Sequence, residues 1–259
     1  MDAICLIAAP GAGTAEAGRV LAACPDVAVH SQVFVPPRVR GIEPEGWALL
    51  SRLTGVRFGR TDDPALAAFV REHPAAWLDA VEATGRDRGK RLMVFSLLSG
   101  DLPVETAGEA VLQRPGLRVI MVMRKQIEAY IASLIAAHPA EAGAAPVRPA
   151  VDVELFAAWL DEQERWHAHW QGWLKRRFLP CPVLRYETDI DQPAGSALRR
   201  IAAAAAQVGV TIRMPAKPPA ATPARADRPP LGETVANWQE LNRAIFARGL
   251  ERRAFGYPV

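Results

Sequence analysis

Short, continuous apolar runs separated by segments of helical periodicity are the main pattern along the chain. Polar residues do not alternate with apolar ones inside these runs, which is typical of strands buried on both faces of a sheet. The predicted strands cover residues 3–9, 27–35, 92–98, 117–123 and 182–186. Because helix-like segments separate them, we predict an α/β fold with a central parallel sheet of about five strands, flanked by helices.

The segments between the runs carry apolar residues at helical spacing. The predicted helices cover residues 14–23, 45–53, 63–84, 125–137, 152–178, 193–208 and 233–248. Pro74 is expected to break the third of these helices, and Asp152 is a suitable N-cap for the longest. The tryptophans at 159, 166, 170 and 173 follow one helical stripe and are interpreted as core. Residues 139–151, rich in alanine, proline and glycine, are predicted to be a loop.

The length and composition fit one domain of this kind. The chain has 259 residues, of which 50% are hydrophobic and 23% charged, so it can bury a sizeable core. We therefore expect a single domain over residues 1–259, with a proline-rich loop at 212–232 inside it.

Charge and cysteine content narrow the function classes. Lysine and arginine total 31 against 28 acidic residues, and a net charge of +3 does not suggest a dedicated nucleic-acid binder. The three cysteines are scattered and specify neither a disulfide framework nor a metal site. The apolar N-terminus lacks the cationic lead-in of a signal peptide, and no apolar stretch reaches the roughly 18 residues of a membrane span. A cytoplasmic protein is expected, and a homodimer is left open.

A glycine turn, Pro10-Gly11-Ala12-Gly13-Thr14, joins the first predicted strand to the first predicted helix. Backbone N–H groups at such a helix start can bind a phosphate. The turn lacks the lysine of a GxxxxGK[ST] nucleotide-binding loop, and it departs from the GxGxxG dinucleotide motif. The residues alone leave two interpretations open: an anion site, or a turn that only lets the helix pack closely.

Three further segments accompany the glycine turn. They are LRVIMVMRKQIEAYIAS at 117–133, PVLRYETDIDQP at 182–193 and VANWQEL at 235–241. In this order, the four segments resemble sulfotransferases that use 3′-phosphoadenosine 5′-phosphosulfate (PAPS), and most closely the bacterial group that sulfates trehalose and nodulation factors. The resemblance implies a P-loop-kinase-like fold, PAPS as co-substrate, a small-molecule hydroxyl acceptor and no metal.

The same resemblance assigns roles to residues. The segment that would hold the 5′-phosphosulfate comprises Gly11, Ala12, Gly13, Thr14 and Ala15. The 3′-phosphate would be held by Arg124, which ends a predicted strand, and by Ser133, nine residues later in the following helix. A guanidinium can fork onto a phosphate, and a hydroxyl can donate to the same anion. The basic loop that closes over the nucleotide would contribute Arg225 and Arg228.

The chain departs from the family pattern at two catalytic positions. Gly11 stands where the family has a cation, and Lys90, just before the third predicted strand, is the candidate replacement for that charge. Gln32 stands where the family has a glutamate base, and an amide orients an acceptor but takes no proton. His30 is the nearest titratable substitute, because residues 30 and 32 of one strand share a face.

These departures leave three functions open. The leading one is sulfuryl transfer, which depends largely on positioning and charge neutralisation. The second is a catalytically impaired descendant that binds a nucleotide or another partner. The third is an enzyme that acts on another phosphoryl-type ligand. Without a strong base, an acidic acceptor such as a phenol is expected rather than a sugar hydroxyl.

Overall fold

The computed structural model describes residues 1–35, 39, 42, 44–58, 60–138, 147–216 and 229–258. Its strands are β1 (Asp2–Ala8), β2 (Val27–His30), β3 (Leu92–Leu98), β4 (Leu117–Met123) and β5 (Val183–Arg185). They form one five-stranded sheet in the order β2-β3-β1-β4-β5, and every neighbouring pair is parallel. The predicted α/β fold with a central parallel sheet is confirmed.

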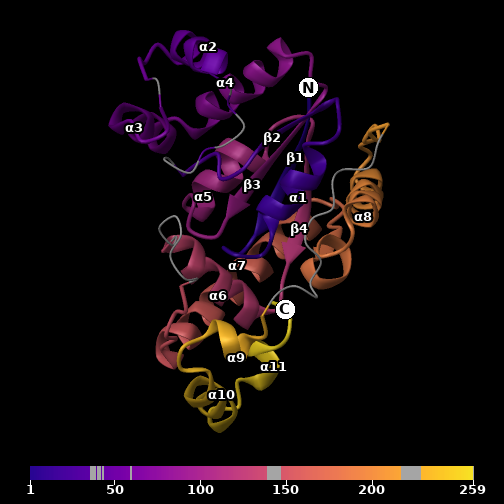
Figure 1. Cartoon of the computed structure of the whole chain (residues 1–259). Helices are drawn as coiled ribbons and strands as arrows, with labels where there is room; N and C mark the ends of the chain where they lie inside the picture. The colour runs from indigo at the N-terminus through magenta and orange to yellow at the C-terminus, as the bar shows by residue number, and fades with distance from the viewer. Residues whose placement is uncertain are drawn as a thin grey trace.

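Helices lie in the connections between consecutive strands and in the chain after β5 (Figure 1). The α-helices are α1 (Thr14–Leu21), α2 (Pro44–Thr54), α3 (Pro64–Glu72), α4 (Pro74–Asp87), α5 (Val104–Thr106), α6 (Gln126–Ala137), α7 (Val153–Arg176), α8 (Ala194–Gln207), α9 (Leu231–Thr234), α10 (Trp238–Ala247) and α11 (Glu251–Ala254). Two π-helices are η1 (Ala107–Leu112) and η2 (Tyr186–Ile190). No helix among the described residues is both long and apolar enough to cross a membrane.

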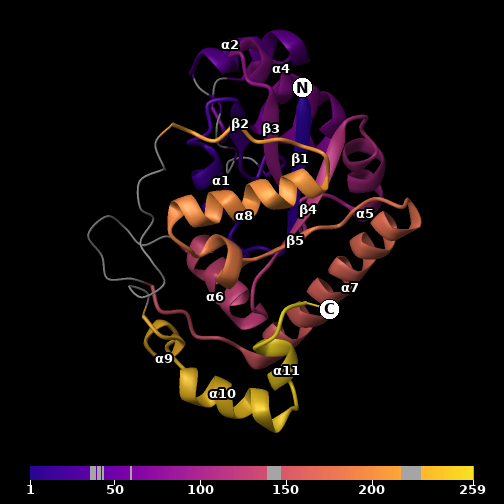
Figure 2. The same cartoon turned by 90° about the vertical axis from the view of Figure 1, so that its right-hand side faces the viewer.

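Helices cover both faces of the sheet. Successive side chains of a strand point to opposite faces, so each strand contributes to both cores. On one face Ile4 and Leu6 pack in a core that includes residues of α1 and α8. Figure 2 shows α8 lying across this face. On the other face Cys5 and Ile7 share a core with residues of α2, α3, α4, η1 and α7. Of the four tryptophans expected in the core, Trp166, Trp170 and Trp173 are buried here. Trp159 is only partly buried and packs against the other two cores.

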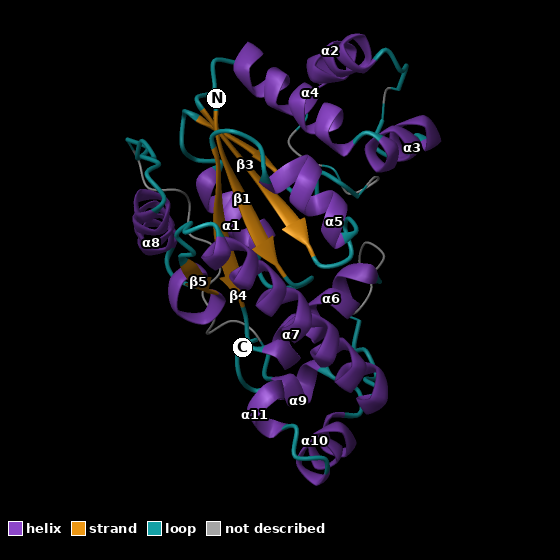
Figure 3. Ribbon diagram, turned by 180° about the vertical axis from the view of Figure 1, so that it is seen from behind, coloured by secondary structure: helices purple, strands orange, loops and turns teal. Residues whose placement is uncertain are grey.

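A third core lies beyond the carboxyl ends of the strands. It joins α6, the amino-terminal half of α7 and α10, through residues that include Ile127, Phe156 and Leu241. Asn237 docks α10 here, since its side-chain amide donates to the Val151 oxygen (3.0 Å) and accepts from the Val151 nitrogen (2.8 Å). In Figure 3 the arrowheads of β1 and β3 point toward α6 and α7.

Some predicted elements need correction. The second strand ends at His30, five residues earlier than expected, and turns follow it. The last predicted helix is divided into α9 and α10. Residues 104–112, for which no element was predicted, form α5 and η1. The expected break at Pro74 is confirmed, because α4 begins there, and Asp152 caps α7 by accepting from Glu154 and Leu155.

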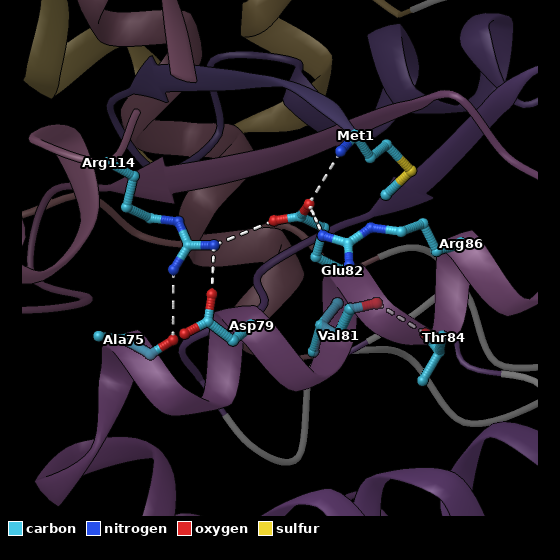
Figure 4. A network of polar contacts seen from close by, with 8 residues as sticks. All are labelled: Met1, Ala75, Asp79, Val81, Glu82, Thr84, Arg86 and Arg114. Atoms are coloured by element: carbon cyan, nitrogen blue, oxygen red, sulfur yellow. Dashed lines mark hydrogen bonds and ion pairs between the residues drawn. The ribbon is translucent and has the colours of Figure 1, made fainter. Parts of the chain in front are cut away.

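A buried carboxylate network ties α4 to the segment that precedes β4 (Figure 4). The Glu82 carboxylate accepts from Arg114 (3.0 Å), from the Met1 amine (3.2 Å) and from Arg86. Burial raises the pKa of Glu82, but the hydrogen bond and charge of Arg86 and the amine outweigh it and hold that pKa below its ordinary value. Arg114 also contacts Asp79 (2.6 Å), so one guanidinium joins two turns of α4.

Candidate functional site

The loop after β1 is shaped by two glycines in the left-handed region. Gly11 has φ 79° and Gly13 has φ 98°. A Cβ on Gly11 would lie 2.1 Å from the backbone oxygen of Ala129 in α6, and a Cβ on Gly13 would lie 2.1 Å from the Tyr186 ring. The loop therefore passes between α6 and Tyr186 with no room for a side chain at either position. In this conformation the cation of the family pattern at position 11 is sterically excluded.

The amino end of α1 is open to an anion. Gly13 is its N-cap residue, and no side chain caps this end of the helix. The first-turn N–H groups of an α-helix, here those of Thr14, Ala15 and Glu16, have no partner within the helix. Together with the helix dipole they form a site that attracts negative charge. Ala12, by contrast, is buried, and its N–H donates to the Ala9 oxygen (3.1 Å), so it adds to the turn rather than to an exposed surface.

Arg124 joins the end of β4 to this loop. Its Nη1 donates to the Gly11 carbonyl oxygen (3.0 Å), and its guanidinium lies over the Tyr186 ring, 4.3 Å from the centroid. Its Nη2 lies 3.6 Å from a carboxylate oxygen of Glu128. The Nε–H is buried and has no hydrogen-bond partner. Of the guanidinium nitrogens, Nη1 therefore holds the loop, Nη2 faces Glu128 of α6, and Nε lacks an acceptor.

Strand order explains why these residues meet. β1 and β4 are neighbours, and their register pairs Ala8 with Val122, so the carboxyl ends of both strands lie side by side. The connection after β1 leads past β3 to β2, whereas the connection after β4 leads the other way to β5, so the chain leaves these two neighbouring strands in opposite directions. Ligands of open α/β sheets bind in the crevice at such a switch point.

Ser133 lies beside the loop but its hydroxyl is engaged. A Cβ on Gly11 would lie 2.9 Å from the Ser133 nitrogen, which shows how closely α6 approaches the loop. The Ser133 Oγ donates to the Tyr130 oxygen of the preceding turn (2.7 Å). The structure thus brings Arg124 and Ser133 to the same loop, and a Ser133 contact to an anion would require the hydroxyl to rotate away from Tyr130.

Glu187 supports the site from the end of β5. Its carboxylate accepts from the Lys125 nitrogen (3.0 Å) and from the Tyr257 hydroxyl (2.9 Å), so it fixes the start of α6. Burial, followed by the hydrogen bond to Glu187 and its charge, raises the pKa of Tyr257 to about 12. The phenol therefore stays a donor across the physiological range.

A cavity of about 720 Å³ opens beside Arg124. Its described lining comes from α6, α9 and the segment before α7, and apolar side chains such as Ile131, Ile135 and Leu231 form much of it. The size suits a nucleoside-sized or drug-sized ligand. The charged groups among the described lining residues are Arg124, Arg148, Glu128, Asp191 and Glu233. The described lining of this cavity therefore contains both acidic and basic groups and is not uniformly cationic.

The geometry proposed for His30 and Gln32 is wrong. His30 is the last residue of β2 and is 1% exposed, whereas Gln32 lies beyond the strand in a turn with φ 53°. The Gln32 N–H donates to the Ser96 hydroxyl (3.0 Å), which holds this turn against β3. The two residues therefore do not share a strand face. β3 also lies between β2 and β1, so His30 is about 10 Å from β1, the strand that precedes the Gly11 loop.

Lys90 lies at the opposite edge of the sheet, and its assignment as the replacement cation is wrong. In the register of β1 and β3, Asp2 pairs with Leu92 and Ala8 pairs with Leu98. Lys90 precedes β3 and donates to the Pro25 oxygen (2.7 Å), so it lies at the amino ends of the strands. The Gly11 loop follows the carboxyl ends. The length of a seven-residue strand, roughly 23 Å, lies between the two positions.

Two candidate residues cannot be placed, and two others were missed. Arg225 and Arg228 lie outside the described residues. Ser99 and Asp101, which the sequence analysis did not single out, follow β3 at the edge that bears the loop. The Ser99 N–H donates to the Ala8 oxygen (3.1 Å), and Asp101 accepts from the Leu98 N–H (2.8 Å). A polar pair directly after a buried apolar run was the available signal, as it was for Arg124.

Within the described ranges, no group of three or more histidine, cysteine or acidic residues is arranged to hold a metal ion. No protein-family model matches the chain, and no curated protein matches it either.

Proposed function

We propose that the chain transfers a sulfuryl group from PAPS to a hydroxyl of a small-molecule acceptor. The observation that carries this proposal is the contact of Arg124 with Gly11, which puts a partly unsatisfied guanidinium beside an uncapped helix start. Fixed donors of this kind match a co-substrate that carries several phosphate and sulfate charges. The adjacent cavity supplies space for the apolar parts of a ligand.

Different residues of the site would bind the different anionic groups of such a co-substrate. The N–H groups of Thr14 and Ala15 at the start of α1 would bind one anionic group. The Arg124 guanidinium, which lines the cavity, would donate to a second, and the Ser133 hydroxyl would join it after leaving Tyr130. Tyr186 holds the Arg124 guanidinium in place through its ring face. These contacts position the anions, and positioning supplies much of the rate in transfers of this type.

The transfer itself exchanges one sulfur–oxygen bond for another. The bond from sulfur to the 5′-phosphate oxygen breaks, and a bond from sulfur to the acceptor oxygen forms. The acceptor hydroxyl loses its proton, and adenosine 3′,5′-bisphosphate is the second product. An acidic acceptor such as a phenol loses this proton with little help, so the absence of the family glutamate favours phenols over sugars. Turnover of a simple sugar but not of phenols would contradict this choice of acceptor.

A second candidate function is a non-catalytic protein that binds a nucleotide through the same edge of the sheet. Two observations favour it. Position 11 cannot carry a cation, because α6 blocks the space a side chain would need. Lys90 lies at the other end of the sheet and so cannot supply the missing charge. A site with anion donors but without a cation facing the sulfuryl group would bind and not accelerate transfer.

A transfer assay separates the two functions. PAPS labelled in its sulfuryl group is incubated with the chain and a panel of phenols and sugars, and labelled product is separated from co-substrate. The proposal expects phenol sulfation that Arg124→Ala reduces at least tenfold, while the exposed-arginine control Arg199→Ala retains it. Binding of adenosine 3′,5′-bisphosphate without transfer to any acceptor would favour the second function.

A further inference from the structure

The carboxyl end of α7 carries an exposed basic and apolar segment. We call residues 175–180 the α7 tip. All six are exposed, directly after the buried Leu174. The tip contains three cations in a row, Lys175, Arg176 and Arg177, followed by two apolar residues. Phe178 is 95% exposed, so its ring projects into solvent rather than onto the fold, and Leu179 is 44% exposed.

Phe178 also has an unusual backbone conformation. Its φ is 54°, in the left-handed region that a bulky side chain rarely adopts. Its N–H donates to the Lys175 oxygen (3.0 Å), and the Leu179 N–H donates to the Leu174 oxygen (3.1 Å), which closes the end of α7. Helices commonly end in this way with glycine, which has no conformational penalty there. The helix dipole accounts for cations in the last turn of α7. It does not account for an exposed phenylalanine with a left-handed backbone at position 178.

We propose that the α7 tip binds the surface of a membrane that contains anionic phospholipid. Within the part of the chain that the structure describes, none of Lys175, Arg176 and Arg177 is ion-paired with a carboxylate. The Arg177 guanidinium lies over the Trp173 ring, 3.9 Å from its centroid, so the group packed against it is an uncharged ring. Cations attract the anionic headgroups, and a projecting aromatic ring enters the interface between headgroups and acyl chains.

The shape of the tip favours a membrane over an acidic protein. A protein partner needs a pocket complementary to a side chain that projects as far as Phe178, whereas a fluid lipid surface adapts to it. Each basic residue near an anionic surface strengthens binding roughly fivefold, and burial of a phenylalanine ring strengthens it by roughly tenfold or more. Three cations and one ring therefore predict weak, reversible and salt-sensitive binding.

Vesicle co-sedimentation tests the proposal. The full chain is mixed with vesicles of phosphatidylcholine alone or with about one third phosphatidylserine, at low and high salt. We expect binding to the anionic vesicles only, and we expect high salt to weaken it. Phe178→Gly should reduce binding at least tenfold while resistance to urea is kept or increased, because glycine removes the backbone strain. This opposite effect on binding and stability separates a binding role from a structural one.

Two matched controls locate the effect. Leu155→Ser removes an exposed apolar residue from the other end of α7 and should leave binding unchanged. Lys175→Glu with Arg176→Glu should abolish binding, whereas Arg199→Glu with Arg252→Glu makes the same change in net charge elsewhere and should reduce it far less. The proposal is overturned if the wild-type chain does not bind anionic vesicles, or if the tip variants bind as it does. Binding to polyglutamate but not to vesicles would also overturn it, in favour of an acidic protein partner.

Discussion

The Nη1 of Arg124 donates to the carbonyl oxygen of Gly11 over 3.0 Å, across 113 residues of chain. This hydrogen bond joins the segments that follow two neighbouring strands, β1 and β4. The same contact limits what the site can do, because it occupies one donor of Arg124 with the protein's own backbone. Whether the site binds an anion therefore depends on the guanidinium N–H groups that are not bonded to Gly11.

The close approach of Gly11 to α6 predicts a large stability effect. Gly11→Ala should lower the free energy of unfolding by about 3 kcal/mol, since a Cβ adds overpacking against Ala129 to the left-handed strain. Gly116→Ala is a matched control with the same φ of 79° and nothing within 4 Å of its Cβ. It should cost only about 1 kcal/mol. Urea denaturation measures both values.

Equal losses for the two glycine variants would show that the loop is not pressed against α6 in solution. Gly11→Lys carries the same expectation further. Although it restores the cation of the family pattern, it should destabilise the protein and should not raise sulfuryl transfer. A gain in transfer for Gly11→Lys would contradict the loop conformation.

The Glu82 network predicts a measurable stability contribution at the amino ends of the strands. Glu82→Gln should lower the free energy of unfolding by about 1–3 kcal/mol, because Arg114 then loses the charge of its buried partner. Asp79→Asn is the control: its side chain is 67% exposed, so it should cost less than about 0.5 kcal/mol. The folded pKa of Glu82 is lowered, so its contribution is present above the ordinary value of 4.5 and is lost as pH falls through the folded value. Denaturation of both variants at pH 7 and pH 3 checks this.

His167 predicts a loss of stability in mild acid. Its Nδ1 contacts the Gln163 oxygen (2.7 Å), and a carbonyl only accepts, so Nδ1 carries the proton and the buried Nε2 is a base without a partner. Burial lowers the pKa of His167 despite that hydrogen bond. Below its ordinary value of 6.5 the unfolded chain therefore takes up a proton before the folded chain does, and folding weakens by up to about 2 kcal/mol at pH 5.

The variant His167→Leu should reduce this acid sensitivity, and the exposed neighbour variant His169→Leu should not change it. Unfolding by urea between pH 5 and pH 7.5 measures the slope for each. If His167→Leu keeps the wild-type slope, the acid sensitivity comes from other groups.

Much of the fold was predictable because its signals are local. Strands buried on both faces produce unbroken apolar runs, and the run that ends in Met123 identified Arg124 as a residue at the edge of a sheet. The N-cap at Asp152 and the break at Pro74 are also set by their own residues. The parallel direction of the strands could also be predicted. A residue that precedes one parallel strand lies at the opposite end of the sheet from a residue that follows a neighbouring strand. Lys90 precedes β3 and Gly11 follows β1, so the sequence already argues against Lys90 as the cation near Gly11.

The rest of the site depends on contacts between distant parts of the chain. The turn that contains Gln32 is held by the hydrogen bond from its N–H to the Ser96 hydroxyl, 64 residues away. The space at Gly11 is closed by α6, and the pattern of the glycine turn does not reveal that approach. Tyr186 lies in the segment 182–193 that carries part of the family resemblance, yet its contacts with Gly13 and Arg124 depend on strand order, which no single segment encodes.

The most direct test is calorimetric titration of the chain with adenosine 3′,5′-bisphosphate. We expect the wild type to bind, Arg124→Ala to lose at least tenfold in affinity, and Arg124→Lys to recover little, because an ammonium does not reproduce the guanidinium fork. Arg199→Ala should bind as the wild type does, and urea denaturation of each variant shows that it is folded. No detectable binding by the folded wild type, or equal binding by Arg124→Ala, would contradict a nucleotide site at this edge of the sheet.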